Sequence, residues 1–366
     1  MRKKISLGVY SLVIIWLLLA ILCLHISPAT FWPTAFIALS LPGALILNIL
    51  FLVVWVFKRS VKAFLPLLVI ILGWSYYERG FAFNLVPDNE LLDVEPKTIQ
   101  VLSYNVRIFN TYAHLQDKNQ QSSKKMIKWV ATHPADIFCL QEFYNERTSP
   151  VYNTVSKIGK QHQKKYYIAE TLVNGVGAQF GLAIFSKHPI LNKGIIRFGE
   201  KTNNLAMFTD IRLKEDTIRV YNFHFQSMSM DEKDIVDSYQ DQDNLKTKGR
   251  KLLGLFKRGI VKRADQVNLL MEHIASCPFP VILCGDTNDL PYSYTYQRLN
   301  SNYTNAFQAK GWGVGATYNG KLPFIRIDNQ FCDEDWEVLN YTKYDSVAYS
   351  DHFPVAVTYK LVSKAK

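Results

Sequence analysis

The sequence predicts an α/β domain built of layered sheets and helices, preceded by a transmembrane helical segment. Two observations carry this prediction. Long apolar stretches lie before residue 80, whereas short apolar runs alternate with helical patterns from residue 97 onward. Strands interleaved with helices are typical of layered α/β domains. The length of 366 residues leaves room for such a domain together with an appendage.

Three apolar stretches near the N-terminus are candidate transmembrane helices. Ile5–Leu24 and Thr34–Phe57 have the length that crosses a bilayer, about 20 residues, while Ala63–Tyr77 is shorter. A cleaved signal peptide is the alternative for the first stretch, and a buried core helix is the alternative for the third. We therefore expect residues 1–80 to form a membrane anchor, with three transmembrane helices.

The basic residues around these stretches predict their orientation. Lysine and arginine cluster before the first stretch and between the second and third, while the loop Ser27–Pro33 contains none. Basic loops stay in the cytoplasm, so three crossings place the remainder of the chain on the extracytoplasmic side. If Ala63–Tyr77 does not cross, the remainder is cytoplasmic. Residues 81–96, with two prolines and several acids, are expected to be a linker.

Residues 97–366 are expected to form the catalytic domain. Its short apolar runs are rich in β-branched and aromatic residues, which favours strands. They are IQVLSYN, DIFCLQE, GLAIFS, IRVYNFHF, VILCGD, RIDNQF and VAVTYKLV. Between them, Lys124–His133 and Arg263–Ala275 have helical patterns, with apolar residues on one face.

Polar side chains stand where these apolar runs stop. One such residue usually does no more than cap a turn. Here, however, the ends of six runs carry carboxylates, amides and histidines, which together suit a divalent metal and a phosphate. They are Asn105, Glu142, His224, Asp286, Asn288, Asp328, Asp351 and His352.

Seven short motifs, in this order, resemble those of the endonuclease/exonuclease/phosphatase family. They are SYN at 103–105, QE at 141–142, GLAIFS at 181–186, NFHF at 222–225, GDTND at 285–289, RID at 326–328 and SDH at 350–352. The resemblance covers about residues 97–362. It implies a four-layer α/β sandwich, in which two packed mixed β-sheets are flanked by helices and the metal and phosphate bind at one rim.

The resemblance also implies a role for each residue of the site. Glu142 corresponds to the principal ligand of Mg²⁺ or Mn²⁺, with Asn105 beside it and Asp351 as a further ligand. The five cysteines match no zinc-binding spacing, so we do not expect a metal held by sulfur.

The remaining residues correspond to the catalytic machinery. Asp286 resembles the residue that orients or deprotonates the attacking water, and Asn288 the one that hydrogen-bonds the scissile phosphate. His352, paired with Asp328, resembles the histidine that stabilises the transition state. His224 matches the second histidine of the deoxyribonuclease and sphingomyelinase branches.

The expected function is therefore a membrane-anchored, divalent-metal-dependent phosphoesterase that hydrolyses phosphodiester bonds. A nuclease is the first expectation, because lysine and arginine exceed the acids by 11 and a basic protein favours anionic partners. A phospholipid or sphingolipid phosphodiesterase or phosphatase is the alternative, and an inactive binding module of the same fold is a second. The sequence leaves the oligomeric state open.

A basic segment at residues 246–263 follows the NFHF strand within what looks like an insertion, 226–262. Three interpretations stay open for it: a solvated helix face, a strip for a polyanion such as nucleic acid, or a contact with anionic lipid head groups. Its basic residues are Lys246, Lys248, Arg250, Lys251, Lys257, Arg258, Lys262 and Arg263.

Overall fold

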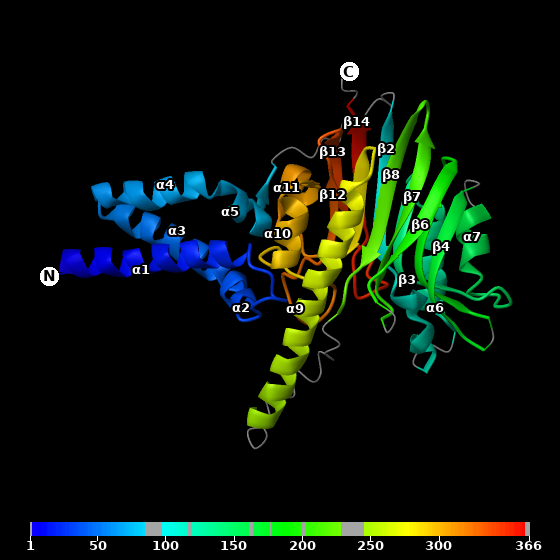
Figure 1. The fold of residues 1–366 in the computed structure, drawn as a ribbon, viewed down its shortest axis with the longest axis horizontal. Helices are drawn as coiled ribbons and strands as arrows, with labels where there is room; N and C mark the ends of the chain where they lie inside the picture. Colours follow the sequence, from blue (N-terminus) through cyan, green and yellow to red (C-terminus); the bar gives the residue numbers. More distant parts are fainter. Residues whose placement is uncertain are drawn as a thin grey trace.

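The computed structural model describes residues 2–84, 97–115, 119–160, 164–175, 177–199, 202–227 and 245–362. A group of apolar helices at the N-terminus extends to one side of a body made of two packed sheets (Figure 1). The body carries every residue of the expected site.

Each of the two large sheets has six strands and is mixed. The first has the order β13-β14-β2-β3-β5-β4, and only its β2–β3 pair is parallel. The second has the order β10-β12-β9-β8-β7-β6, and only β8–β9 is parallel. The strands of the first are β2 (Thr98–Asn105), β3 (Ile137–Asn145), β4 (Lys165–Val173), β5 (Gln179–Ser186), β13 (Trp336–Lys343) and β14 (Val355–Leu361). Those of the second are β6 (Ile190–Arg197), β7 (Leu205–Leu213), β8 (Asp216–His224), β9 (Val281–Asp286), β10 (Thr304–Asn305) and β12 (Asp328–Cys332).

The core lies in three layers because side chains alternate along each strand. Val101 packs between the two sheets with residues such as Met207 and Ile282. Its neighbour Leu102 packs on the outer face. The two sheets therefore share one apolar interior, and each keeps a second apolar face for helices to cover.

Helices cover both outer faces and complete the four layers that the sequence predicts. Residues of α6 (Gln121–Thr132) and α7 (Thr154–Lys160) pack on the first sheet. Residues of α9 (Leu245–Ala275) and α10 (Tyr294–Asn300) pack on the second. Shorter elements complete the body: η2 (Arg107–Leu115), α11 (Ala306–Lys310) and β11 (Trp312–Gly313). The expected helix Arg263–Ala275 is the second half of α9, which begins eighteen residues earlier.

The N-terminal helices only partly match the expected anchor. They are α1 (Arg2–Cys23), α2 (Thr34–Leu39), α3 (Leu41–Phe57), η1 (Val61–Ala63), α4 (Phe64–Leu72) and α5 (Trp74–Gly80). Among the described residues, one helical stretch, Thr34–Phe57, which comprises α2 and α3, is long and apolar enough to cross a membrane. The expected third helix bends by 71° between Leu72 and Trp74, because Gly73, which has a low helix propensity, ends α4 there.

A buried asparagine holds these helices together. The Asn48 side chain of α3 is fully buried and accepts a hydrogen bond of 2.7 Å from the Tyr10 hydroxyl. Its amide nitrogen lies 2.9 Å from the Tyr77 hydroxyl and 3.2 Å from the carbonyl oxygen of Pro66. An amide in an apolar setting needs such partners, so this one residue ties α1, α4 and α5 to α3.

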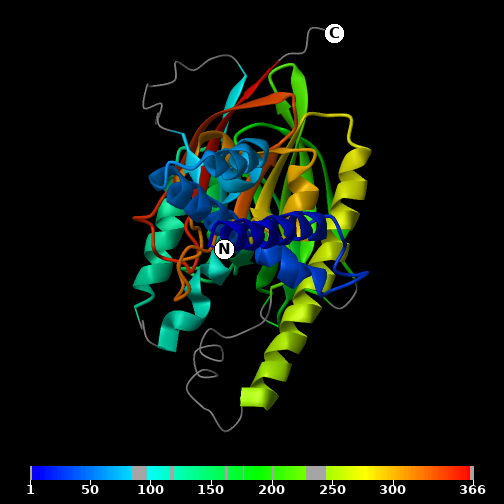
Figure 2. The ribbon, with the colours of Figure 1, turned by 90° about the vertical axis from the view of Figure 1, so that its left-hand side faces the viewer.

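The same helices are joined to the body of two packed sheets by specific polar contacts. The buried Arg79 guanidinium donates to the side chain of Gln297 on α10 at 2.6 Å, and the Tyr292 hydroxyl donates to the carbonyl oxygen of Tyr76 at 3.0 Å. Part of the expected linker forms β1 (Ala82–Phe83), which pairs with β11. Residues 85–96 of that linker lie outside the described part of the chain. Figure 2 shows the apolar helices in front of the body that they contact.

Candidate active site

The strands bring the polar residues of both sheets to one rim. In the second sheet, Asp286 at the end of β9 is the register partner of His224 on β8 and of Asp328 on β12. In the first sheet, Asn105 at the end of β2 is the partner of Gln141 within β3, where the parallel pairing of the two strands ends. The carboxyl ends of parallel strands meet at one edge of a sheet, so both parallel pairs end at this rim.

Gly285 is required for this alignment. A β-carbon at this position would lie 2.1 Å from the carbonyl oxygen of Phe223 and 2.7 Å from its ring. Only glycine leaves room for so close an approach. The GD dipeptide therefore places Asp286 directly beside His224.

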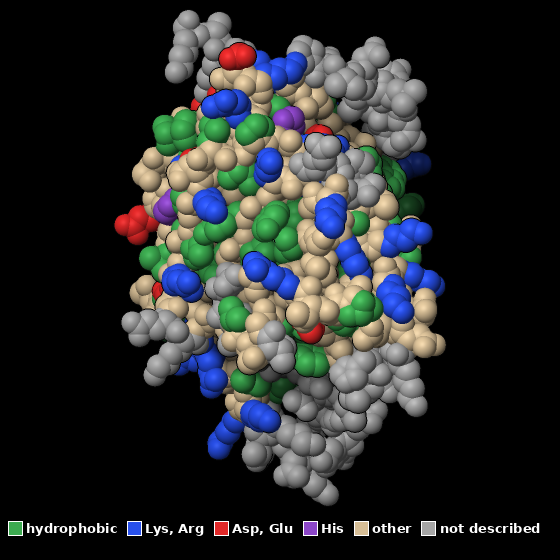
Figure 3. Space-filling view, turned by 90° about the vertical axis from the view of Figure 1, so that its right-hand side faces the viewer, with side chains coloured by type: hydrophobic (Ala, Val, Ile, Leu, Met, Phe, Trp, Pro, Cys, Tyr) green, Lys and Arg blue, Asp and Glu red, His purple; other side chains and the backbone are tan. Residues whose placement is uncertain are grey.

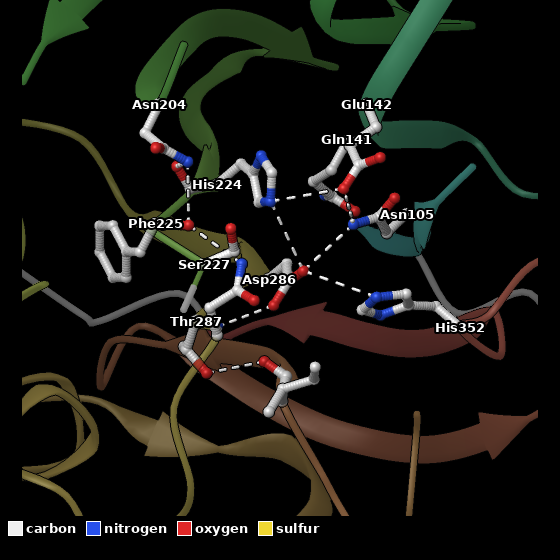
Figure 4. Close-up of polar contacts among 12 residues, drawn as sticks. Asn105, Gln141, Glu142, Asn204, His224, Phe225, Ser227, Asp286, Thr287 and His352 are labelled. Atoms are coloured by element: carbon white, nitrogen blue, oxygen red, sulfur yellow. Dashed lines mark hydrogen bonds and ion pairs between the residues drawn. The ribbon is translucent and has the colours of Figure 1, made fainter. Parts of the chain in front are cut away.

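The Asp286 carboxylate is the centre of the site (Figure 4). One oxygen, Oδ2, accepts a hydrogen bond from the Asn105 amide at 3.1 Å. The same oxygen lies 3.7 Å from Nε2 of His224 and 3.8 Å from Nε2 of His352. The other oxygen, Oδ1, accepts from the backbone N–H of Asn288 at 2.7 Å. Two histidines and an amide from three different strands and loops thus face one buried carboxylate.

Glu142 reaches the site through an irregularity in β3. The register between β3 and β5 shifts between Leu140 and Phe143, and Glu142 has a φ of 49°. A bulge of this kind redirects a side chain out of the strand's alternation. Its Oε1 accepts from the Asn105 amide at 3.1 Å and lies 3.7 Å from Nε2 of His224. The side chain remains 37% exposed, so its carboxylate is open to a ligand.

His352 and Asp328 form a buried pair. Nδ1 of His352 lies 2.8 Å from Oδ2 of Asp328, and both side chains are less than one tenth exposed. Burial alone disfavours the charged imidazolium, but the carboxylates of Asp328 and Asp286 outweigh it and raise the pKa of His352 to about 10. At neutral pH the imidazole therefore carries a proton, and Nε2 directs it toward Asp286.

The pKa of Asp286 is shifted in the direction that suits a general base. Burial raises its pKa to about 6, although the nearby His352 opposes this change. The carboxylate is therefore ionised at neutral pH and far more basic than an exposed aspartate. A group with a pKa just below the working pH is well matched to accepting a proton.

Two of the expected site residues have other contacts in this structure. The Asn288 amide donates to the carbonyl oxygen of Phe225 at 3.0 Å, although its φ of 48° keeps it at the rim beside Asp286. The Asp351 carboxylate pairs with Arg107 at 3.3 Å and accepts from the Ser350 hydroxyl at 3.1 Å. Glu142 and Asn105 are thus brought together, whereas Asp351 is turned toward Arg107.

A polar bridge that joins the two sheets below the rim had no role in the sequence-based expectations. The buried Gln141 amide donates to the Asn222 side chain at 2.7 Å. Asn222 in turn donates to the carbonyl oxygens of Leu140 and Ala183, both at 3.0 Å. Gln141 belongs to the QE motif and Asn222 to the NFHF motif, so these motifs were the sequence signal for the bridge. The bridge fixes β3 and β8 relative to each other directly beneath Glu142 and His224.

A second contact corrects the expectation for Arg263. Its guanidinium is buried and pairs with the Asp289 carboxylate at 3.0 Å, and it also donates to the carbonyl oxygen of Gln226. Arg263 is therefore a structural residue that holds the GDTND loop, and it does not belong to a solvated basic strip. The signal was its helical spacing from Ile260 and Val267 (i−3 and i+4), which face the core.

A cavity of about 450 Å³ opens beside the carboxylates. Glu142 and His224 line it together with Asn204, Gln226 and Lys262. Lys262 comes from α9 and supplies the cationic side chain of the lining. A phosphate group placed here reaches both the carboxylate centre and a positive charge.

The residues present fit a divalent cation. Glu142 supplies carboxylate oxygens, which Mg²⁺ and Mn²⁺ prefer. Asn105 lies beside it, with its amide nitrogen toward Glu142 and its amide oxygen accepting from the backbone N–H of Arg107 at 3.0 Å. Nε2 of His224 and Oδ1 of Asp328 are buried with no hydrogen-bond partner, and both belong to residues of the site. Asp286, Asp328 and His352 also form a cluster whose ligand atoms lie within 4.8 Å of one another. The hydrogen bond between His352 and Asp328 in this cluster favours proton transfer over metal binding. The more exposed Glu142 is therefore the better ligand for the cation.

Comparison with known protein families shows which family this chain belongs to. The chain matches the Endonuclease/Exonuclease/phosphatase family over residues 102–352. It belongs to this family. Residues 3–80 match a separate domain of unknown function. No curated protein matches the chain.

Solved structures of family members share the fold. One from Bacteroides thetaiotaomicron has a TM-score of 0.53 at 18% identity, covering 73% of this chain and 99% of its own. One from Bacteroides vulgatus has a TM-score of 0.51 at 14% identity, covering 72% and 99%. A mannosyl-6-phosphatase from Bacteroides thetaiotaomicron has a TM-score of 0.50 at 17% identity, covering 71% and 99%. The two packed mixed sheets are thus the family's fold, as the motifs predict, and the catalytic body is a phosphoesterase scaffold.

Proposed function

We propose that this chain is a membrane-attached, divalent-metal-dependent hydrolase of phosphodiesters. One observation carries the proposal: a single buried carboxylate, Asp286, lies within 4 Å of His224, His352 and Asn105, with Glu142 adjacent. Hydrolysis of a diester needs a base for water, a proton for the leaving oxygen and neutralisation of the phosphate charge. Each need has a matching group at this rim.

Glu142 and Asn105 would hold the metal, which when bound neutralises charge on a phosphate oxygen. Asp286 accepts the proton of the attacking water, whose oxygen forms the new bond to phosphorus. His352, kept protonated by Asp328, donates its proton to the ester oxygen whose bond to phosphorus breaks. His224 and Asn288 would donate hydrogen bonds to the remaining phosphate oxygens, Asn288 with the amide hydrogen that the Phe225 carbonyl does not accept.

The assignment of Glu142 gives a prediction about the metal. We expect Glu142→Gln to raise the half-saturating Mg²⁺ concentration by at least about 10-fold, because it removes the carboxylate ligand while keeping the shape of the side chain. Titration of Mn²⁺ binding by calorimetry and the Mg²⁺ dependence of the hydrolysis rate both measure this effect.

Glu146→Gln is the matched control for this variant. Glu146 follows the same strand and accepts from the Tyr144 hydroxyl at 2.9 Å, outside the carboxylate centre. It should leave metal binding unchanged. Equal metal affinity in Glu142→Gln and the wild type would show that the cation is held elsewhere, with the Asp286, Asp328 and His352 cluster as the next candidate.

Membrane attachment is supported by the surface of the N-terminal helices. Only 28% of the most apolar part of Thr34–Phe57 is buried, and large apolar side chains of all three long apolar stretches face outward, among them Leu12, Ile15, Ile46, Phe57 and Ile71. An exposed apolar surface of this extent needs a partner, and a bilayer is the one that matches helices of this length.

The orientation predicted by the basic residues follows as part of this proposal. An alkaline phosphatase fused after Lys366 should be active, since that enzyme works only outside the cytoplasm, while a fluorescent protein fused there should stay dark. The reverse pattern would mean that the bent segment Val61–Gly80 does not cross, and that the catalytic domain is cytoplasmic.

Two substrate classes remain within the proposal. The positive charge of the chain supports a nucleic acid, the first expectation from the sequence. The attachment of the catalytic body to apolar helices supports a lipid head group. Phosphomonoesters form a further candidate, because a protein of the same fold is named a mannosyl-6-phosphatase. Hydrolysis of DNA, RNA, sphingomyelin, a phosphoinositide and mannose 6-phosphate, measured side by side, separates these classes.

A further inference from the structure

Residues 249–258 of α9 are not part of the core. Val267, Leu270, Met271 and Ile274, in its second half, pack against the second sheet. The turns before Gly259 extend past the catalytic body, toward the bottom of Figure 1. The cationic side chains of these turns and the next are exposed: they are Arg250, Lys251, Lys257, Arg258 and Lys262.

Apolar side chains lie among these cations. Leu253 is 44% exposed, and Phe256 stacks on Phe36 with ring centroids 4.7 Å apart. The Lys257 ammonium lies 5.2 Å from the ring of Trp32. Phe36 and Trp32 belong to the segment that joins α1 to α3, so α9 contacts the N-terminal helices directly.

The direction of α9 relative to those helices decides what it contacts. Helices α1, α3 and α4 extend away from the body, and α9 runs across their direction at the end nearest to the body (Figure 1). Figure 2, viewed from the side of the apolar helices, shows α9 passing beside them and continuing below. A helix that crosses the base of membrane helices lies in the plane of the membrane surface.

We infer that residues 249–262 of α9 lie along an anionic lipid surface, at the place where the apolar helices enter the bilayer. This inference rests on the proposed membrane attachment. Arg250, Leu253 and Lys257 are spaced by three and four residues and so share one face of the helix. Since Lys257 on that face contacts Trp32, the face is directed toward the base of the apolar helices.

The combination of side chains favours lipid over nucleic acid. A basic helix with apolar residues inserts the apolar side chains at the head-group boundary, while the cations bind the anionic head groups. A nucleic-acid strip needs the cations but not an exposed leucine beside them. On the side of the body away from the apolar helices, Lys and Arg are spread among hydrophobic and neutral polar side chains (Figure 3).

This surface adjoins the active site. Lys262, at the end of the exposed part of α9, lines the cavity that also contains Glu142 and His224. Contact of α9 with lipid therefore brings that cavity close to the head-group layer, where a phosphoester of a lipid head group is accessible to it.

The test uses the full chain in lipid nanodiscs, with a spin label at Leu253→Cys in a Cys277→Ser background, because the other four cysteines are buried. Accessibility of the label to oxygen and to a water-soluble nickel complex is compared between discs of phosphatidylcholine alone and discs containing phosphatidylglycerol. We expect the label to lose at least half of its accessibility to nickel and to gain accessibility to oxygen in the anionic discs.

Charge reversal by Arg250→Glu with Lys251→Glu should abolish this difference between discs. The matched control, Lys125→Glu with Lys128→Glu on the exposed face of α6, should keep it. A label equally accessible to nickel in both discs would overturn the inference, as would protection of the label by single-stranded DNA or RNA and not by lipid.

Failure of the lipid-contact inference can be distinguished from failure of the proposed function. The α9 charge-reversal variant should hydrolyse a small soluble diester in detergent at the wild-type rate, since neither residue belongs to the site. Loss of all hydrolysis by the wild type would refute the proposed activity without affecting the label. Failure of the chain to elute with nanodiscs would refute the membrane attachment on which the inference depends.

Discussion

Asp286→Asn is expected to lower kcat/KM for phosphodiester hydrolysis by about 10²–10⁴-fold, the range for loss of a general base. Asparagine keeps the size of the side chain and can still accept from the Asn288 backbone at Oδ1. It cannot take a proton, and it loses the negative charge that lies between His224 and His352. The fold should be retained, because Gly285 and the strand register are unaltered.

Asp333→Asn is the matched control for this variant. The Asp333 carboxylate accepts from the backbone N–H of Val281 at 2.7 Å, at the opposite end of the strand that Asp286 terminates. Burial raises its pKa to about 6 as well, so the same chemical change is made in a similar environment without touching the site. If both variants lose activity equally, the effect is structural, and Asp286 is not the base.

His352→Ala and Asp328→Asn should each lower kcat strongly, and the double variant should be no worse than His352→Ala alone. The reason is that Asp328 acts through the imidazole, 2.8 Å away, by keeping it protonated and oriented. Residues that work as one unit give non-additive losses. Rates are measured on a small diester with a good leaving group and on one with a poor leaving group, and the loss should be larger for the poor one, which needs the proton.

His133→Ala serves as the control for this pair. His133 is also buried and lies 3.0 Å from the Tyr344 hydroxyl, away from the rim, and burial lowers its pKa to about 4. Its loss should cost stability but leave kcat within about 2-fold, because it contacts no group of the site. A double variant of His352 and Asp328 that loses the full product of the single effects would show two independent roles.

The fold could be predicted because the polar residues at the strand ends and the order of the motifs indicated the same two-sheet architecture. Apolar runs ended at Asn105, His224 and Asp286, and these three side chains do lie at one rim of two packed sheets. The order of the motifs also indicated the family, which the comparison confirms. Alternation along strands and the spacing of polar ends are local properties, and a single sequence shows them.

Other features depend on contacts between distant residues and could not be predicted in this way. The bulge that turns Glu142 into the site arises from the pairing of β3 with β5, which no local pattern of the QE motif reveals. Arg263 follows a run of basic residues; its spacing indicates a core-facing position, but its partner Asp289 is brought to it only by the fold. The bend at Gly73 divides a stretch whose apolar composition alone suggested one crossing.

The central claim is that this rim hydrolyses phosphodiesters with a bound divalent metal. The most direct measurement is hydrolysis of bis(p-nitrophenyl) phosphate by the purified full chain in detergent, as a function of added Mg²⁺ and Mn²⁺, after treatment with a chelator. We predict no turnover without metal, saturable turnover on its return, and a rate lowered by about 10²–10⁴-fold with Asp286→Asn. Full activity in excess chelator, or equal activity of the Asp286→Asn variant, would contradict the account.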